Sequence, residues 1–269
     1  MKKYMQANQK LWDEKVAVHV GSEFYDVPGF VAGDSSLYPV EEEEIGGLVK
    51  GKTLLHLQCH FGMDTITWAR RGAIPTGVDF SEKGIEQARK LAGELGVDAR
   101  FIHSNIYDLP DVLDETFDIV FTSYGVLAWL PDLKAWGQLI GCYLKPGGFF
   151  YMVELHPFSM VFEDDPEGTI KVDVPYFHED EPIEWEVEGT YADLDAKMET
   201  EKEYEWLHSM SDIVGGLLDA GLQIDYLHEF DYTVFQHFKM LNKEGRLYTQ
   251  PEGFPKIPLL FSLMAHKPE

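Results

Sequence analysis

The segment 53–81 constrains most strongly what this chain can fold into. Its pattern predicts an apolar strand, a turn, a short amphipathic helix and a second apolar strand that ends in an acid, Asp79. In such a β-α-β unit the turn and the acid meet at the carboxyl edge of a parallel sheet. A carboxylate there suits a vicinal ribose diol, because it can accept hydrogen bonds from both hydroxyls. The segment therefore predicts a nucleoside-cofactor site.

Strands and helices alternate through the rest of the core. This alternation predicts a parallel sheet with helices on both faces. We expect further strands at 100–104, 117–123, 149–155, 222–230 and 259–266. We expect helices at 64–71, after Ser81, from Asp132 to Leu144, and at 209–221.

Three later landmarks accompany these strands. They are Ser104-Asn105-Ile106, Phe117-Asp118-Ile119-Val120 and Leu144-Lys145-Pro146-Gly147-Gly148. In this order and spacing the chain resembles the class I S-adenosylmethionine-dependent methyltransferases, particularly those that act on small molecules, over residues 51–154 and a terminal hairpin. The resemblance implies a doubly wound, mostly parallel seven-stranded α/β sheet of Rossmann-like type. It also implies S-adenosylmethionine as cofactor and in-line methyl transfer to a small-molecule acceptor.

The first motif departs from this family. The family has Asp-x-Gly-x-Gly-x-Gly where this chain has His56-Leu57-Gln58-Cys59-His60-Phe61-Gly62, so Gly62 alone of the three glycines is present. Glycine permits positive φ and close backbone approach. We therefore expect Gln58 and His60 to line a cradle of different shape. A nicotinamide dehydrogenase is disfavoured further, since its G-x-G-x-x-G turn is missing.

The resemblance also implies the site residues. The expected cofactor-binding residues are Gln58, Cys59, His60, Gly62, Asp79, Phe80, Ser104, Asn105, Ile106, Ser123 and Tyr124. Asp79 is expected to bind the ribose, and Asn105 the adenine edge. Tyr124 is expected nearest the transferred methyl, where it would orient an acceptor or shield the sulfonium by a cation–π contact.

Methyl transfer needs mainly proximity and alignment, and a general base only if the acceptor must lose a proton. His156, which follows Glu154 at the end of the fifth predicted strand, is the candidate proton acceptor, because histidine titrates near neutrality. The alternative, positioning alone with a structural His156, stays open. The run His178-Glu179-Asp180-Glu181 is interpreted as a solvated acidic loop, so no metal site is expected.

Three regions are expected along the chain. Residues 1–50 form an N-terminal helical lid segment with helices at 9–18 and 41–49, a loop at 25–39, and Trp12, His19 and Tyr25 as candidates to close over the cofactor. In this lid the acids at 41–44 are expected to be a solvated helix start. Residues 51–155 and 209–269 form the core.

The third region, 156–208, is an acidic, aromatic-rich insertion after strand five. Between Glu154 and Met210 there are 18 acids and three lysines. Polar and apolar residues alternate at 183–187 and 197–206, which predicts antiparallel strands. We expect an antiparallel β cap over the acceptor site, with Trp185, Tyr191 and Trp206 as its main aromatics.

A net charge of −25 argues against nucleic acid as partner. No apolar run approaches the roughly 20 residues that span a bilayer, and no apolar signal segment follows the first lysines. Cys59 and Cys142 give neither a disulfide framework nor a zinc spacing, which favours a reducing cytoplasm. We expect a neutral or cationic small-molecule acceptor.

Two rival functions remain. One is a non-enzymatic protein that binds S-adenosylmethionine or its homocysteine product. A cap that fills the cavity with its own side chains would favour it, whereas an open cavity with ordered polar groups would favour the enzyme. The other rival is a nicotinamide-dependent oxidoreductase.

Overall fold

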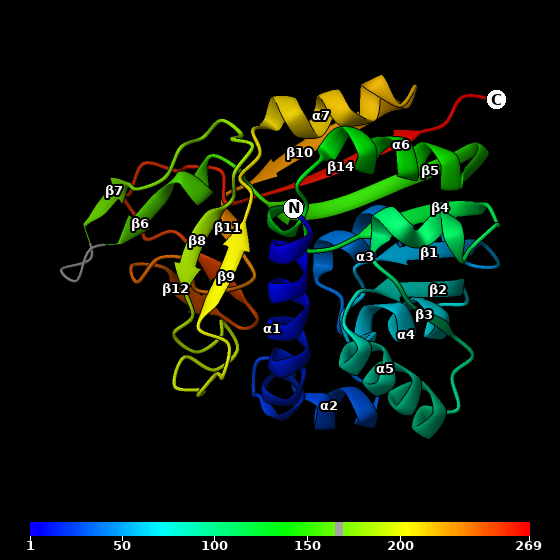
Figure 1. The fold of residues 1–269 in the computed structure, drawn as a ribbon, viewed down its shortest axis with the longest axis horizontal. Coiled ribbons are helices and arrows are strands. Elements are labelled where there is room, and N and C mark those ends of the chain that lie inside the picture. The colour runs from blue at the N-terminus through cyan, green and yellow to red at the C-terminus, as the bar shows by residue number, and fades with distance from the viewer. Residues whose placement is uncertain (165–168) are drawn as a thin grey trace.

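The computed structural model describes residues 1–164 and 169–269, and a seven-stranded sheet runs through it (Figure 1). The strand order is β10–β14–β5–β4–β1–β2–β3. β14 runs antiparallel to both of its neighbours, and the other adjacent pairs are parallel, which confirms the predicted doubly wound sheet. The strands are β1 Thr53–Leu57, β2 Ile74–Asp79, β3 Arg100–His103, β4 Phe117–Thr122, β5 Leu144–Leu155, β10 Gln223–Phe230 and β14 Leu260–His266.

Helices cover both faces of this sheet. Side chains alternate along β4, so that Val120 joins a core cluster with α6, α7 and η1, while Ile119 and Phe121 join a second cluster with α3 and α4. The helices are α1 Lys2–Gly21, α2 Val27–Ala32, α3 Pro39–Ile45, α4 Met63–Arg70, α5 Glu82–Leu95, α6 Leu133–Tyr143 and α7 Met210–Asp219, with the short 3-10 helices η1 Ile106–Asp111, η2 Leu127–Trp129 and η3 Ser159–Val161.

The core helices begin and end near the predicted residues. The side chains of Ser81, Asp132 and Ser209 each cap a helix by accepting a hydrogen bond from a backbone N–H three residues later. Gly96 ends α5 in the left-handed conformation at φ +63°. These local signals explain why the core could be predicted from sequence.

The N-terminal segment is more helical than predicted. α1 extends beyond the expected 9–18 and packs between α5 and β9 (Figure 1). The prediction of a loop throughout 25–39 is wrong, because α2 forms within it. The Asp26 side chain accepts a hydrogen bond from the Gly29 N–H, and a proline lies in the first turn.

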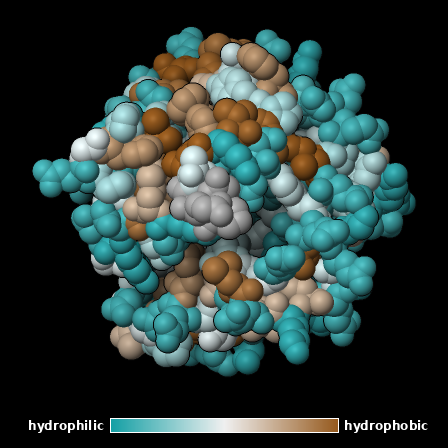
Figure 2. Space-filling model, turned by 90° about the vertical axis from the view of Figure 1, so that its left-hand side faces the viewer, coloured by the Kyte–Doolittle hydropathy of each residue, from teal (hydrophilic) through white to brown (hydrophobic). Residues whose placement is uncertain are grey.

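Two groups of short strands lie beyond the carboxyl edge of the main sheet. In the insertion, β8 (Ile183–Glu186) pairs antiparallel with β9 (Lys202–Glu205), as predicted, and β6 (Phe162–Asp164) pairs with β7 (Ile170–Val172). Residues 165–168 of the predicted cap lie outside the described residues. A three-stranded sheet between β10 and β14 was not predicted; it contains β11 (Tyr232–Thr233), β12 (Asn242–Glu244) and β13 (Leu247–Thr249). Figure 2 shows this side of the molecule, with hydrophilic residues around most of its rim.

Candidate cofactor and acceptor site

A cavity of about 380 Å³ opens at the carboxyl edge of β1, β2 and β4. Small-molecule sites typically enclose about 300–1,000 Å³. Residues from α1, from the insertion and from the β10–β14 connection complete its wall. The predicted residues that line it are Gln58, Cys59, His60, Gly62, Asp79, Phe80, Ser123, Tyr124, Trp12, Tyr25 and Tyr191.

The turn after β1 keeps the backbone conformation of a glycine turn, although Gln58 and His60 occupy two of the three glycine positions. Gln58 has φ +56°, His60 has φ +50° and Gly62 has φ +82°. These are the three glycine positions of the family motif. At Gly62 a Cβ would lie 2.6 Å from the Phe101 ring and 2.8 Å from Ala88 Cβ, so no larger residue fits. Positive φ costs other L-residues about 1–2 kcal/mol each, so this turn holds backbone strain.

Asp79, at the end of β2, anchors this turn. Its Oδ2 accepts a hydrogen bond from the His60 N–H at 2.8 Å, and its Oδ1 accepts one from the Ser81 N–H at 2.8 Å. Burial raises the pKa of Asp79 to about 6, so the carboxylate is mainly ionised at neutral pH. Each oxygen retains a further lone pair beside the cavity. The side chain thus has the acceptor capacity that a ribose diol requires.

The N-terminal helix lies directly on the turn. His19 Nδ1 and His60 Nε2 are 2.9 Å apart, and the Trp12 ring meets the His60 ring edge-on at 5.2 Å. Burial lowers the pKa of His19 to about 3 and that of His60 well below its usual range, so both rings are neutral and one donates to the other. Tyr25 and Tyr191 join the N-terminal segment to the insertion through a hydroxyl–hydroxyl hydrogen bond of 2.5 Å.

Tyr124 follows β4 and pairs with a buried acid. Its hydroxyl donates to Glu41 Oε2 at 2.7 Å, and the Tyr38 N–H donates to the same oxygen at 3.0 Å. Glu41 is fully buried, so the expectation of a solvated helix start is wrong at this residue. Burial, followed by the nearby Asp64 carboxyl, raises the pKa of Glu41 to about 8. Glu41 lies behind Tyr124 and contributes no atom to the cavity wall.

A second buried acid holds the loop after Tyr124. Glu154, near the end of β5, accepts hydrogen bonds from the backbone N–H groups of Gly125, Val126 and Leu127. Burial raises its pKa to about 7. Gln58 Nε2 donates to the Val126 carbonyl at 2.9 Å. The side chain of the cradle turn therefore reaches a loop that Glu154 fixes in place.

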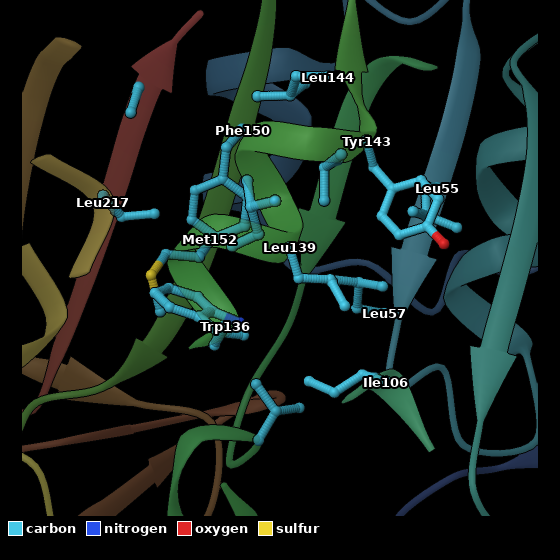
Figure 3. Packing of buried hydrophobic residues seen from close by; sticks show 14 of the residues in the cluster. Leu55, Leu57, Ile106, Trp136, Leu139, Tyr143, Leu144, Phe150, Met152 and Leu217 are labelled. Atoms are coloured by element: carbon cyan, nitrogen blue, oxygen red, sulfur yellow. The ribbon is translucent and has the colours of Figure 1, made fainter. Parts of the chain in front are cut away.

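The triplet Ser104-Asn105-Ile106 does not line the cavity. The Asn105 side chain accepts a hydrogen bond from the Tyr107 N–H and begins η1, which is the turn-forming role. Ser104 Oγ donates to the Asn105 carbonyl. Ile106 lies in the core beside Leu57 (Figure 3). Their predicted contacts with the adenine gain no support from this arrangement.

His156 also lies outside the cavity wall. Its Nε2 contacts Glu229 Oε1 at 3.0 Å, and its Nδ1 accepts a hydrogen bond from the Phe158 N–H at 3.1 Å. Both ring nitrogens are therefore engaged away from the cavity. In this structure both ring nitrogens of His156, the predicted proton acceptor, are held by structural contacts.

Several lining residues were missed from the sequence. Asp64 lies in the first turn of α4, and burial raises its pKa. Arg246, in the turn between β12 and β13, stacks on Tyr38 with its guanidinium carbon 4.2 Å from the ring centroid. Its guanidinium also donates to the backbone carbonyls at Ser35, Ser36 and Leu37. Arg246 follows a glycine between two strands of only three residues each, and so short a pattern does not predict that it lies at the site.

The comparisons with known proteins agree with this geometry. Residues 54–148 match the family model described as a methyltransferase domain. The ubiquinone biosynthesis O-methyltransferase of Bordetella avium is 30% identical over 122 residues, which is 45% of this chain and 50% of that protein. The demethylmenaquinone methyltransferase of Clavibacter sepedonicus is 32% identical over 123 residues, 45% of this chain and 49% of that protein. The chain spans about half the length of these curated relatives.

Solved structures extend the likeness to nearly the whole chain. An S-adenosylmethionine-dependent methyltransferase from Mesorhizobium loti has a TM-score of 0.57 at 18% identity, over 88% of this chain and 100% of that one. One from Clostridium acetobutylicum has a TM-score of 0.56 at 15% identity, over 96% of each chain. At such identities the likeness concerns the fold. With the matched methyltransferase domain at 54–148 and the strand order, it shows the fold of the S-adenosylmethionine-dependent methyltransferases over nearly the whole chain.

Proposed function

We propose that this protein transfers a methyl group from S-adenosylmethionine to a small-molecule acceptor by in-line displacement. The observation that carries the proposal is the meeting of the glycine-type turn, Asp79 and Tyr124 in one cavity of about 380 Å³. S-adenosylmethionine supplies a methyl group on a positively charged sulfur. The protein supplies position, alignment and exclusion of water, which together contribute up to about 7–11 kcal/mol in favourable cases.

Each group has a defined task in this proposal. Asp79 accepts hydrogen bonds from the ribose hydroxyls through its free lone pairs. Tyr124 lines the cavity, and its hydroxyl is fixed by a hydrogen bond to Glu41 behind it. Trp12, Tyr25 and Tyr191 form an aromatic roof that keeps water from the reacting atoms.

We infer that the acceptor is neutral or cationic. The carboxyls of Asp64 and Glu205 line the cavity. Arg246, whose guanidinium bonds three backbone carbonyls, is already engaged. Similar proteins include the ubiquinone biosynthesis O-methyltransferase and a glycopeptide N-methyltransferase, so phenols, alcohols and amines form the first panel to test. An overall charge of −25 still argues against nucleic acid.

We infer that residues 1–50 act as a lid and residues 156–208 as a cap of the same site. Contacts support this: Tyr25 from the first segment bonds Tyr191 from the second above the turn. No helix in the described part of the chain has the length and apolar content needed to cross a membrane. Cys59 and Cys142 are free thiols, which is compatible with the reducing cytoplasm that we propose as compartment.

Binding and turnover are tested separately. Calorimetric titration with S-adenosylmethionine and with a nicotinamide dinucleotide identifies the cofactor, and native mass spectrometry of the purified protein detects any retained ligand. Methyl-labelled S-adenosylmethionine is then incubated with the acceptor panel, and formation of S-adenosylhomocysteine is measured. Tight binding without turnover on any acceptor would favour the non-enzymatic rival. Binding of the dinucleotide alone would overturn the proposal.

A further inference from the structure

A histidine of the cavity wall remains without a task in the proposed function. His237 lies in the connection between β11 and β12, lines the cavity and is partly exposed. Its Nε2 lies 3.0 Å from the backbone carbonyl oxygen of Ser159. Because a carbonyl oxygen only accepts hydrogen bonds, Nε2 carries the proton and donates it, and Nδ1 of the neutral ring keeps a lone pair. This hydrogen bond therefore selects the tautomer in which Nδ1 can accept a proton.

The other ring nitrogen, Nδ1, is available to a ligand. It has no hydrogen-bond partner in the part of the chain that the structure describes, and it is not among the unpartnered side-chain atoms that are shielded from solvent. Nδ1 of His237 therefore keeps accessible surface on a residue that borders the cavity. His156 differs in both respects, because it lies outside the cavity wall and both of its ring nitrogens are engaged.

The segments on either side of the His237 ring are themselves fixed. Ser159 is buried, and its N–H and hydroxyl donate to the His156 carbonyl at 2.9 and 2.8 Å. Phe238, the next residue after His237, is fully buried and packs with Leu241 and Leu259. The orientation of the ring is therefore set by the fold, as a general base requires.

The strand order places His237 on the acceptor side of the cavity. Asp79 ends β2, and from there the main sheet continues through β1, β4, β5, β14 and β10. Tyr124 follows β4, and the connection that contains His237 joins β10 to β14 beyond it. When the nucleoside occupies Asp79, the part of the cavity beside His237 is left for the acceptor.

The basicity of His237 favours one class of acceptor. Burial lowers its pKa below the ordinary value of 6.5, while the bond to Ser159 and the nearby Asp164 carboxyl on β6 act in the opposite direction. The ring is thus neutral at pH 7 and a weak base. A weak base suits a hydroxyl, because the O–H becomes strongly acidic as its oxygen bonds to the methyl carbon. A protonated amine must lose its proton before it attacks, which a weak base achieves poorly.

We propose that His237 is the proton acceptor for methyl transfer to a hydroxyl group of the small-molecule acceptor. The inference rests on the proposed function and names its acceptor class. A lone pair of the hydroxyl oxygen forms the new oxygen–carbon bond while the carbon–sulfur bond breaks. The electron pair of the broken bond stays on sulfur, which becomes a neutral thioether. The hydroxyl proton passes to Nδ1, and the imidazolium later releases it to water.

The tautomer is tested first, and this test needs no acceptor. Long-range proton–nitrogen correlation spectra of the histidine side chains are recorded for wild type and for His237→Gln, and the signal that the variant lacks belongs to His237. Glutamine keeps an N–H for the Ser159 carbonyl but has no basic nitrogen. We expect a protonated Nε2, an unprotonated Nδ1 and a titration midpoint below 6.5. A protonated Nδ1 at neutral pH would overturn the proposal.

Turnover of a phenol or alcohol from the acceptor panel tests the role itself. The wild-type kcat should fall as pH falls through the pKa of His237. His237→Gln should be about 100-fold slower or more and should lose this pH dependence. Its S-adenosylmethionine affinity should stay within about twofold of wild type, and thermal melting checks that it is folded. His156→Gln is the matched control, because its ring lies outside the cavity wall, and it should keep both the rate and the pH dependence.

The outcomes separate this inference from the proposed function. A His237→Gln variant with the wild-type rate and pH dependence, or a wild type that methylates only amines, would overturn the role of His237 alone. Failure to bind S-adenosylmethionine, or absence of turnover on every acceptor, would instead contradict the proposed function.

Discussion

The cradle and the roof of the cavity are built in different ways. The cradle, residues 53–81, is local: Asp79 bonds the His60 N–H across 19 positions and the Ser81 N–H across two. The roof lies where the N-terminal segment meets the insertion, and it joins residues that are far apart in the sequence. Asn8 bonds Tyr204 across 196 positions, and Tyr25 bonds Tyr191 across 166. Contacts between residues close in the sequence, as in the cradle, can form early in folding. The contacts of the roof form only when segments far apart in the sequence have been brought together. The cradle should therefore control cofactor affinity, and the roof should control closure.

The largest effect is expected in the cradle. Asp79→Ala removes the ribose acceptor and the anchor of the turn, so S-adenosylmethionine affinity should fall roughly ten- to a hundred-fold. Calorimetric titration measures this. Equal affinities of variant and wild type would contradict the assignment of Asp79 to the ribose and the proposed difference between cradle and roof.

The roof is tested at α1. Asn8 is fully buried; its Nδ2 donates to the Tyr204 carbonyl at 2.7 Å and its Oδ1 accepts from the Tyr204 N–H at 3.0 Å. Asn8→Ala leaves both backbone groups unpaired, so the free energy of unfolding should drop by about 1–3 kcal/mol. Denaturant unfolding measures the loss. Affinity for S-adenosylmethionine should change much less than in Asp79→Ala; an equally large loss would show that cradle and roof are not separable.

Glu41 joins the N-terminal segment to the cavity wall, since it belongs to α3 and bonds Tyr124. Its pKa of about 8 in the folded protein lies above the ordinary value of 4.5. The folded state therefore holds the proton more tightly, and the resulting stability is full below about pH 4.5 and lost as pH rises through about 8. Besides Tyr124, the titratable groups that interact with it are Asp64, Tyr38, Tyr151 and Tyr232, with Arg246 stacked on Tyr38.

Glu41→Gln should remove this dependence. Between pH 5 and pH 8 the wild type should lose about 1.4 kcal/mol or more of stability relative to the variant, the equivalent of at least one pKa unit. Urea unfolding at a series of pH values gives the difference. Parallel curves for the two proteins would mean that Glu41 ionises normally.

The smallest effect is expected at His156. Because its ring contacts Glu229 outside the cavity, His156→Gln should leave S-adenosylmethionine affinity unchanged and cost about 0–1 kcal/mol of stability. With an acceptor in hand, the rate should also keep its pH profile. A roughly 100-fold slower rate with loss of an ionisation between about pH 5.5 and 7.5 would restore His156 as general base.

The same contrast explains what could be predicted from the sequence. β2 ends at Asp79 and α5 begins after Ser81, as predicted, because capping and apolar periodicity are local signals. The left-handed φ of Gln58 and His60 was not predicted, since neither residue type indicates it. That conformation is imposed by the surrounding contacts, including the bond from the His60 N–H to Asp79.

Residues outside the cradle were harder to predict, because their roles depend on contacts between segments that are far apart in the sequence. Glu41 stands in a run of four acids that is typical of a solvated helix start, and only the fold brings Tyr124 to it. The strands β11, β12 and β13 have only two or three residues each, which is too short for an alternation of apolar and polar residues to be recognised. His156 was chosen for its chemistry and its place at a strand end. The contact with Glu229, from β10, could not be foreseen.

The position of β14 has a consequence for synthesis on the ribosome. β10 is made before β14, yet it pairs with β14 alone in the main sheet, and β14 in turn lies against β5. Until the segment Leu260–His266 has left the exit tunnel, β5 presents an open edge and β10 has no partner. Nascent chains stalled before this segment should therefore be the most prone to associate with one another and the most dependent on chaperones.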